Sequence, residues 1–352
     1  MKKYYLSIAA LLLGLLAHSQ EADDLGNYAE VSIIPRLDLN PSWNTGNSAF
    51  GFDLGNSSLY TLFEGSASEH FSWTVANHWF APGEWPVLRD EFDPLSMFRN
   101  LGRSDDVNWI DFLKADLTFG NWTFTLGKDC ISTGGFEYED WDWEVHPLLA
   151  SPLWNNLAPY QWGGKAAWTS PDESTTLSVQ MTTSPFGEHP FSSGLWTYSA
   201  QWRGEYGWYS PIWSASAFGI DRGEYAWIFS FGNRINFTDE WALTLDWSNT
   251  AGMTYDYGGM LRGCTFHGRL DYAPSERFDV SLRGNYILMD KSIDPLLYEF
   301  SENWWNLGAA VEFYPLRDSQ DLRLHAVAAY DRAFSQLSFS FGLLYNLCFR
   351  LW

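Results

Sequence analysis

The sequence predicts an all-β fold: a transmembrane antiparallel up-and-down β-barrel of about 16 strands, with short periplasmic turns and long external loops. The last long segment, residues 336–351, alternates apolar and polar side chains without a break. Successive side chains of a strand point to opposite faces, so this strand has one continuous apolar side. A strand of that length with an uncovered apolar face would aggregate in water, whereas it suits the lipid-facing wall of a barrel.

The second observation is an export signal without a later membrane-spanning helix. Lys2 and Lys3 precede an apolar stretch from residue 4 to 17, and small residues follow at the cleavage positions. This pattern predicts a cleaved signal peptide, residues 1–19, and a single mature domain, residues 20–352. No later stretch has the ~18 consecutive apolar residues of a transmembrane helix. The exported chain is therefore expected to be either soluble or a barrel.

Composition agrees with the barrel but does not decide it. Hydrophobic residues make up 46% of the chain and aromatic residues 18%, which fits the aromatic girdles of membrane barrels. A secreted carbohydrate-binding sandwich is also rich in aromatic residues. The net charge of −22, or −24 once the two N-terminal lysines are removed, argues against nucleic acid as a partner. The three cysteines, Cys130, Cys264 and Cys348, have no spacing typical of a disulfide framework or a metal cluster.

The third observation is that short and long connections alternate along the chain. Seven tight turns are expected at 68–70, 120–121, 171–173, 205–207, 238–240, 274–276 and 317–320. Eight other connections are expected at 39–57, 80–106, 133–160, 185–195, 221–224, 251–258, 290–303 and 332–335. Fifteen connections join sixteen strands, with both chain ends on the short-turn side. Bacterial outer-membrane barrels sort their connections in this way.

The polar face of each strand predicts a lumen lined by charges of both signs. The basic side chains on this face are Lys114, Lys165, Arg203, Arg234, Arg269, Arg283 and Arg323. The acidic ones are Glu30, Glu64, Asp116, Asp246, Asp271 and Glu312, and His267 and His325 share the face. Arg262 and Lys128 break this register, and we expect both near the outer interface, where charge is tolerated. These residues predict either a water-filled pore or a lumen satisfied by internal ion pairs and plugged by a loop.

The third long connection carries the densest set of acidic and aromatic residues. Its carboxylates are Glu137, Glu139, Asp140, Asp142 and Glu144, interleaved with Trp141 and Trp143. If the loop folds inward, these carboxylates would face the basic wall and narrow the channel, so that solutes are sorted by charge and dipole. The alternative is an external acidic lid. The acidic connection at 80–106 is expected at the surface.

Part of the chain resembles a known porin family. The segments Leu126-Gly127-Lys128, Gly134-Gly135-Phe136-Glu137-Tyr138, Tyr160-Gln161-Trp162-Gly163 and Thr183-Ser184-Pro185-Phe186 resemble porins related to the phosphate-selective O and P type. The resemblance covers about residues 120–190 and implies a trimeric sixteen-stranded channel with a constricting third loop. That family uses a dense ladder of basic residues, whereas here the bases are spread and the loop is acidic, so phosphate selectivity is not carried over. Trp352 also lies one residue out of the lipid-facing phase.

The sequence therefore predicts an outer-membrane porin and not an enzyme. No Gly-x-Ser-x-Gly or His-Glu-x-x-His motif is present, and no calcium-loop pattern surrounds the acidic pairs. A barrel enzyme acting on lipid and a non-conducting scaffold for capsule or a secretion partner are the rival hypotheses. The expected partners are small hydrophilic solutes, outer-membrane lipid and lipopolysaccharide, and further copies of the chain in a trimer; no cofactor or metal is expected.

Overall fold

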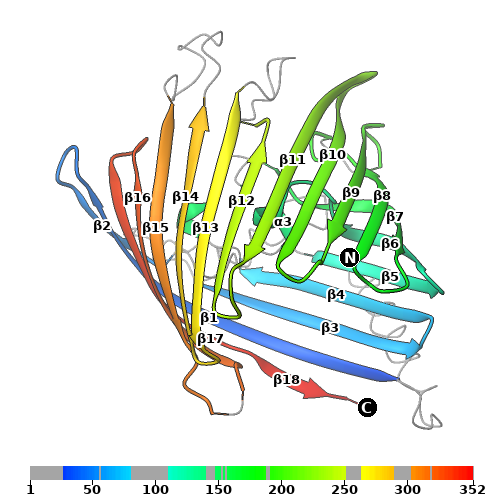
Figure 1. The fold of residues 1–352 in the computed structure, drawn as a ribbon, viewed down its shortest axis with the longest axis horizontal. Coiled ribbons are helices and arrows are strands. Elements are labelled where there is room, and N and C mark those ends of the chain that lie inside the picture. Colours follow the sequence, from blue (N-terminus) through cyan, green and yellow to red (C-terminus); the bar gives the residue numbers. More distant parts are fainter. Residues whose placement is uncertain are drawn as a thin grey trace.

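The computed structural model describes residues 27–54, 57–80, 110–139, 147–151, 154, 157–187, 191–250, 263–288, 303–317 and 319–351. These residues form one continuous antiparallel sheet of eighteen strand segments (Figure 1). The segments are β1 (Tyr28–Asn44), β2 (Phe50–Asp53), β3 (Ser58–Ser68), β4 (Phe71–Phe80), β5 (Ile110–Phe119), β6 (Trp122–Cys130), β7 (Tyr160–Thr169), β8 (Thr175–Thr183), β9 (Trp196–Gly204), β10 (Tyr209–Asp221), β11 (Glu224–Asn236), β12 (Trp241–Ser248), β13 (Cys264–Ser275), β14 (Phe278–Leu288), β15 (Trp304–Phe313), β16 (Leu322–Asp331), β17 (Gln336–Tyr345) and β18 (Leu347–Arg350).

The sheet closes on itself through its first strand. β1 pairs with β2 and β3 along one edge and with β17 and β18 along the other. Since β2 and β3 lie in line, and β17 and β18 do too, the described segments make a sixteen-stranded barrel. Every strand is then paired on both sides, and no open edge remains to recruit another chain. The predicted fold class is confirmed.

The closure seam holds a buried group of charged and ionisable side chains. On β1, Arg36 forms an ion pair with Asp38, and the two side chains are 1% and 0% exposed. On β16, His325 Nε2 lies 3.0 Å from Asp38 Oδ1. Gly342 on β17 makes room for both, because a Cβ there would lie 1.7 Å from Asp38 Oδ1. The absence of a side chain at Gly342, on the inner face of β17, thus has a packing reason.

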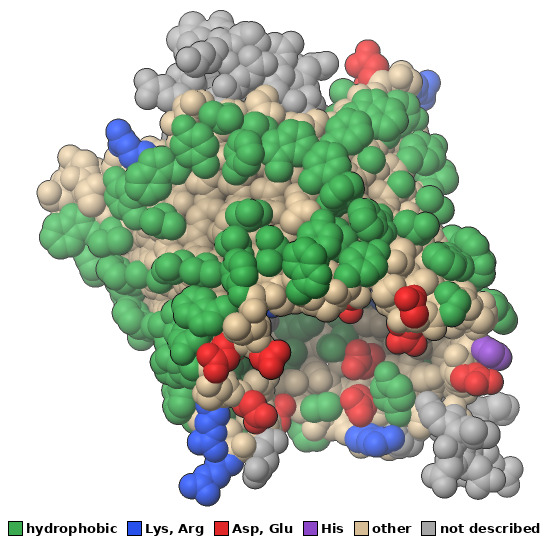
Figure 2. All heavy atoms as spheres, viewed as in Figure 1, with side chains coloured by type: hydrophobic (Ala, Val, Ile, Leu, Met, Phe, Trp, Pro, Cys, Tyr) green, Lys and Arg blue, Asp and Glu red, His purple; other side chains and the backbone are tan. Residues whose placement is uncertain are grey.

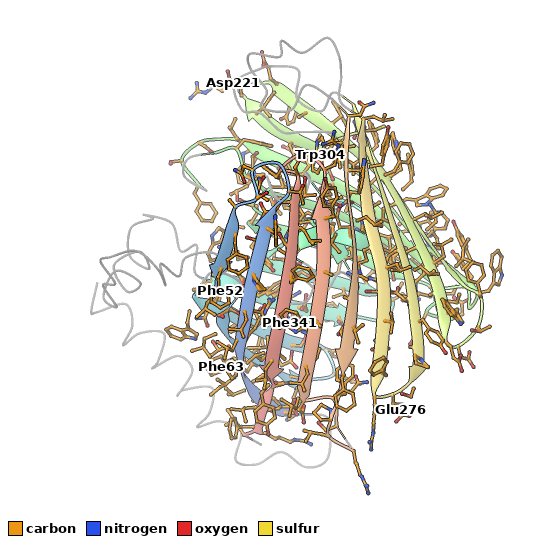
Figure 3. All side chains as sticks on the ribbon, turned by 90° about the vertical axis from the view of Figure 1, so that its left-hand side faces the viewer. Phe52, Phe63, Asp221, Glu276, Trp304 and Phe341 are labelled. Carbon is orange, nitrogen blue, oxygen red and sulfur yellow. The ribbon has the colours of Figure 1, made fainter. Side chains whose placement is uncertain are left out.

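Most predicted turns are found where the sequence placed them. β3 and β4 are joined by residues 69–70, β5 and β6 by 120–121, and β11 and β12 by 237–240. The turn at the end of β13 lies slightly later than predicted, since β13 runs to Ser275 with a register shift after Tyr272. Figure 3 shows the two ends of the barrel, with Asp221 at the long-connection end and Glu276 at the short-turn end.

Three boundaries differ from the prediction. β1 continues to Asn44 and β2 folds back on it, so the first long connection is mainly an extended hairpin and not a loop from residue 39. The stretch 206–219 shows no clear alternation in the sequence, yet its residues 209–219 belong to the regular strand β10. The last strand is interrupted at Asn346, whose backbone amide donates to the Asp321 carbonyl 2.8 Å away. Both halves still pair with β1, so the interruption is local.

The outer wall is apolar along its whole circumference. Phe341, Leu343 and Tyr345 are exposed on β17, whereas Ser340 and Leu344 between them are buried. Figure 2 shows hydrophobic side chains spread over this outer surface. Exposed aromatic side chains also gather near the short turns, where an amphipathic ring suits the lipid headgroup level. They are Phe119, Trp122, Trp208, Trp241, Phe278 and Phe313.

The connection between β6 and β7 folds into the barrel. It contains the short helices α3 (Phe136–Glu139) and η1 (Pro147–Leu149). The helix α3 contacts β11 and β12, and η1 contacts β14 and β15. Figure 1 places α3 behind β11 and β12, on the inner side of the wall. None of the described helices is long and apolar enough to cross a membrane.

Candidate functional site

The third loop is held to the inner wall by backbone and side-chain hydrogen bonds. The amide of Glu137 donates to Asp246 Oδ2 on β12 at 2.7 Å, and Ser214 Oγ on β10 donates to the Gly134 carbonyl at 2.7 Å. Farther along the loop, Asn285 Nδ2 on β14 donates to the Leu149 carbonyl at 2.7 Å. The described parts of the loop therefore cross the interior from the β10–β12 side to the β14–β15 side. The hypothesis of an external lid does not fit these parts of the loop.

Glycines let the loop approach the wall closely. A Cβ at Gly232 on β11 would lie 2.6 Å from Asp246 Oδ1 and 3.0 Å from the Phe136 amide nitrogen. A Cβ at Gly308 on β15 would lie 2.9 Å from a methyl carbon of Leu149. Since contacts of this kind fall well inside van der Waals distance, side chains at these two positions would push the loop away.

An apolar cluster inside the barrel anchors the start of the loop. Ile131, Tyr138 and Leu157 from the connection pack against the inner faces of β10 and β11, at Phe218 and Ile228. Sequence reasoning missed this cluster because it assigned one polar face to every strand. The run 225–229 could have revealed it, since a strand segment that is apolar at every position is expected to be covered on both sides.

Two cavities of unequal size lie between the third loop and the inner wall in the part of the chain that the structure describes. A chamber of about 440 Å³ is lined by Lys114, Lys165, Asp129, Glu139 and Gln201, together with aromatic side chains. A second cavity of about 260 Å³, lined by Arg203, Arg234 and Phe136, lies beyond α3. Of the predicted basic residues, the structure thus brings Lys114 together with Lys165, and Arg203 together with Arg234.

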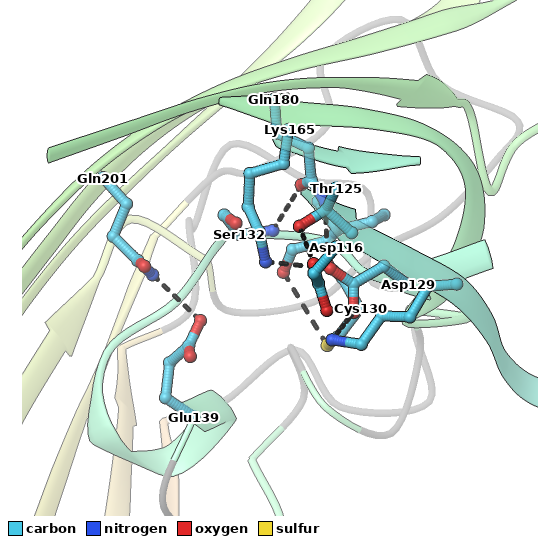
Figure 4. Close-up of polar contacts among 11 residues, drawn as sticks. Asp116, Thr125, Asp129, Cys130, Ser132, Glu139, Lys165, Gln180 and Gln201 are labelled. Atoms are coloured by element: carbon cyan, nitrogen blue, oxygen red, sulfur yellow. Dashed lines mark hydrogen bonds and ion pairs between the residues drawn. The ribbon is translucent and has the colours of Figure 1, made fainter. Parts of the chain in front are cut away.

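The two lysines of the larger chamber share one carboxylate. Lys114 Nζ donates to Asp129 Oδ1 at 3.1 Å, and Lys165 Nζ donates to Asp129 Oδ2 at 2.8 Å (Figure 4). Sequence reasoning missed Asp129, although it follows Thr125 and Gly127 in the inward-facing register of β6. Lys128 lies near the end of β6 as expected, but it is buried, and its Nζ donates to the Ile110 carbonyl at 2.7 Å.

Most of the other predicted basic residues also have a carboxylate neighbour. Arg269 Nε lies 2.6 Å from Asp271 Oδ2, and Arg323 lies 3.5 Å from Glu312 Oε2. Arg203 Nε lies 3.5 Å from Glu205 Oε1 at the rim. Arg234 donates instead to the Asn236 amide oxygen at 3.2 Å. Arg283 is buried and interacts with Glu137.

The acidic residues of the loop behave differently from one another. Glu139 lines the larger chamber, and its Oε1 accepts a hydrogen bond from Gln201 Nε2 at 2.9 Å. Glu137 points into the wall and not into a cavity large enough for solute; its Oε1 accepts the Ser151 amide at 2.7 Å. Asp140, Asp142, Glu144 and Arg262, and the acidic residues expected at 80–106, lie outside the described residues. Among the described residues, no three His, Cys, Asp or Glu side chains are arranged as a metal site.

The fold matches solved bacterial channels at low sequence identity. The outer-membrane channel DcaP of Acinetobacter baumannii aligns with 93% of this chain and 99% of its own, at 12% identity and a TM-score of 0.56. A triple mutant of the Rhodopseudomonas blastica porin aligns with 91% of this chain and 100% of its own, at 11% identity and a TM-score of 0.55. No protein-family model and no curated protein sequence matches. The chain therefore has the fold of bacterial outer-membrane porins, as the sequence predicts.

Proposed function

We propose that the protein is an outer-membrane channel through which small hydrophilic or charged solutes diffuse. The observation that carries this proposal is the inner face of a closed barrel of porin fold, where charged side chains border cavities of about 440 and 260 Å³. Apolar side chains cover the outside, so charged groups and water are confined to the lumen. Figure 2 agrees, with acidic side chains around a hollow near the short-turn end.

The proposed constriction lies between the third loop and the barrel wall. The basic wall would consist of Lys114, Lys165, Arg203, Arg234, Arg269, Arg283 and Arg323. Of the predicted loop carboxylates, Glu139 would face this wall, and Asp140, Asp142 and Glu144 are proposed to do the same. Glu137 is left out of this set because it is buried against Ser151. The inward position of α3 supports this proposal, because it places Glu139 in the same chamber as two of the lysines. Charges of opposite sign across a narrow passage orient a dipolar solute and slow the passage of a poorly matched one.

The proposed setting follows from the fold and the N-terminus. Residues 1–19 would direct export and be removed, and residues 20–352 would insert into the outer membrane among lipid and lipopolysaccharide. The resemblance to trimeric porins and the porin fold support a homotrimer. Solute transport by diffusion needs no cofactor, and we expect no enzymatic activity and no nucleic-acid partner.

A specific observation favours one alternative. The inner faces of β10 and β11 carry the apolar cluster around Phe218 and Ile228, and many other inward-facing side chains are buried. A lumen packed in this way would suit a non-conducting scaffold that presents its loops to a capsule or secretion partner. We favour the channel because the two cavities described above remain between the loop and the wall.

Single-channel recording distinguishes these two functions. The mature chain would be refolded into a planar bilayer, and current would be recorded across a salt gradient. Discrete conductance steps are expected from a channel, and a folded, inserted barrel that stays silent would eliminate it in favour of the scaffold.

The reversal potential of the same recording reports ion selectivity. We expect a preference for cations, because Lys114 and Lys165 share the Asp129 carboxylate, Arg269 and Arg323 each have a carboxylate partner, and the chain carries a net charge of −22. Pairing leaves the basic wall with little net positive charge to attract anions. A preference for anions would mean that the lysines and arginines dominate despite their partners.

A further inference from the structure

The chamber between the third loop and β5–β9 has the size and lining of a small-molecule site. Its volume of about 440 Å³ falls within the roughly 300–1,000 Å³ typical of ligand pockets. Such pockets combine an apolar lining with a few converging polar groups. Both kinds of group line this chamber.

One side of the chamber offers a single excess positive charge. Lys114 and Lys165 both bind Asp129, so these three groups of the lining sum to one positive charge. The Asp116 carboxylate also acts on Lys165, but it does not line the chamber and accepts a hydrogen bond from Thr125. The lysine side chains are 20% and 25% exposed, whereas Asp129 is only 8% exposed. Each ammonium has three donors and gives one to Asp129, so the remaining donors can reach a solute. This side therefore suits one carboxylate.

The facing side offers one negative charge on the loop. The Glu139 carboxylate accepts a hydrogen bond from the Gln201 side chain at 2.9 Å, and both residues line the chamber. A carboxylate has about four lone-pair sites, so Glu139 can accept a cationic donor from a solute in addition to the partners that it already has. In Figure 4, Glu139 and Gln201 lie across the chamber from the group formed by Lys165 and Asp129.

Two aromatic pairs supply the apolar part of the lining. The rings of Phe112 and Tyr160 meet edge to face with centroids 5.0 Å apart, and those of Tyr138 and Trp154 meet in the same way at 4.9 Å. All four residues line the chamber. Aromatic faces and edges of this kind favour another ring or a flat apolar group.

We propose that this chamber is a binding station for small zwitterions with an aromatic or apolar side chain, the class of the aromatic α-amino acids. The solute carboxylate would bind Lys114 and Lys165, its ammonium would bind Glu139, and its ring would contact the aromatic pairs. The inference deepens the proposed channel function and rests on it only for the route by which the solute arrives.

The arrangement selects against solutes with a single sign of charge. An aromatic anion satisfies the lysines but leaves the Glu139 carboxylate facing an apolar group. An aromatic cation satisfies Glu139 but leaves the two lysines facing an apolar group. A dianion brings its second negative charge towards the Glu139 carboxylate, which repels it. A site built to hydrogen-bond a group discriminates against analogues that lack it, because its own polar atoms lose their partner.

Binding to the folded, full-length mature barrel in detergent tests the inference without requiring conduction. Equilibrium dialysis near neutral pH would compare L-phenylalanine with phenylpropanoate, phenylethylamine and glycine, which lack the ammonium, the carboxylate and the ring respectively. We expect each analogue to bind about tenfold more weakly than L-phenylalanine, the loss expected when one charge-assisted hydrogen bond or one ring contact is removed. Equal binding of L-phenylalanine and phenylpropanoate would overturn the zwitterion site.

Two variants and two matched controls assign the contacts. Glu139→Gln keeps an acceptor for Gln201 and is expected to weaken L-phenylalanine binding about tenfold while phenylpropanoate binds as before or more tightly. Lys165→Gln is expected to weaken both. Glu224→Gln and Arg222→Gln remove the same charges at exposed positions of the β10–β11 connection and are expected to change neither. Equal effects of Glu139→Gln and Glu224→Gln would contradict the assignment.

The two proposals can fail separately. A barrel that binds L-phenylalanine selectively but never conducts would contradict the proposed channel function and support the proposed binding site. A conducting barrel that binds none of the four compounds would contradict the station and keep the channel. In a conducting barrel, L-phenylalanine is also expected to interrupt the ion current reversibly, and Glu139→Gln is expected to shorten the interruptions, since weaker binding acts mainly on dissociation.

Discussion

Glu137 sits between two groups with opposite effects on its ionisation. Burial, helped by the nearby Asp246 carboxylate, raises the pKa of Glu137 to about 8, although the hydrogen bond from Ser151 and the charge of Arg283 both act to lower it. Other ionisable groups that face it are Arg283 on β14 and His267 on β13, which borders the same small cavity. A carboxyl held in this way is neutral through most of the physiological range.

From the raised pKa of Glu137 we predict that the docking of the third loop onto the barrel wall weakens as pH rises. The pKa of Glu137 in the docked loop is about 8, against 4.5 for the free side chain. The docked state therefore binds more protons than the undocked state between these values, and its stability falls from pH 4.5 to about 8 and then levels off. The protection of the segments 134–139 and 147–151 against hydrogen exchange, corrected for the intrinsic rise of amide exchange with pH, is expected to fall over this range. Glu137→Gln, which keeps the acceptor for Ser151, is expected to remove the dependence; an unchanged pH profile would mean that another group controls docking.

At the scale of elements, the third loop packs against the inner wall at positions where the strand residue is glycine. Gly232 on β11 is the clearest such position, because its missing Cβ leaves room for both Asp246 and the Phe136 amide. Overpacking at a site of this kind costs about 1–3 kcal/mol. The cost falls on the docked loop through Phe136 and on the Asp246 side chain of β12, whose carboxylate holds the loop, while the backbone of β11 is regular there.

Gly232→Ala is therefore expected to release the loop while the barrel stays folded. Limited proteolysis of the segment 133–159 should become roughly 5- to 100-fold faster, since cleavage follows the population of the open form. The matched control is Gly268→Ala on β13, where a Cβ would meet only Leu245 at an ordinary 3.8 Å. Equal cleavage rates in the two variants would show that the close contact at Gly232 does not hold the loop.

The strands can be predicted well from the sequence because the pattern that defines each one lies within a short stretch of neighbouring residues. Alternation along a strand fixes which residues face lipid, and the turn residues fix where it ends, so β11 and β12 were assigned with their correct faces. The loop was not predictable in the same way, because its docking depends on Gly232, Gly308 and Leu149, which are far apart in sequence. Asp129 could have been found from the register, whereas its bonds to Lys114 and Lys165 required the positions of β5 and β7.

At the scale of the whole molecule, the outer wall must match the bilayer. Leu282 lies near the middle of β14 and is 51% exposed on the apolar face. Leu282→Arg is expected to destabilise the barrel in lipid vesicles by about 2–4 kcal/mol, measured by urea unfolding, because a charge at the bilayer midplane is costly. Leu316→Arg, on the short connection after β15, is the control and should cost about 0–1 kcal/mol. Equal costs would place Leu282 away from the midplane.

The pairing of the first strand with the last also bears on whether the barrel requires its strands to begin at β1 in the sequence. Glu30 at the start of β1 lies opposite Arg350 at the end of β18, so the two ends of the barrel sequence meet at the same rim. Neighbouring strands are only about 5 Å apart, a gap that a few added residues can span. A circular permutant that joins residues 350 and 28, with new termini in the turn between β7 and β8, would keep every strand pair. The ring has a fixed order in space but no required starting point along the chain.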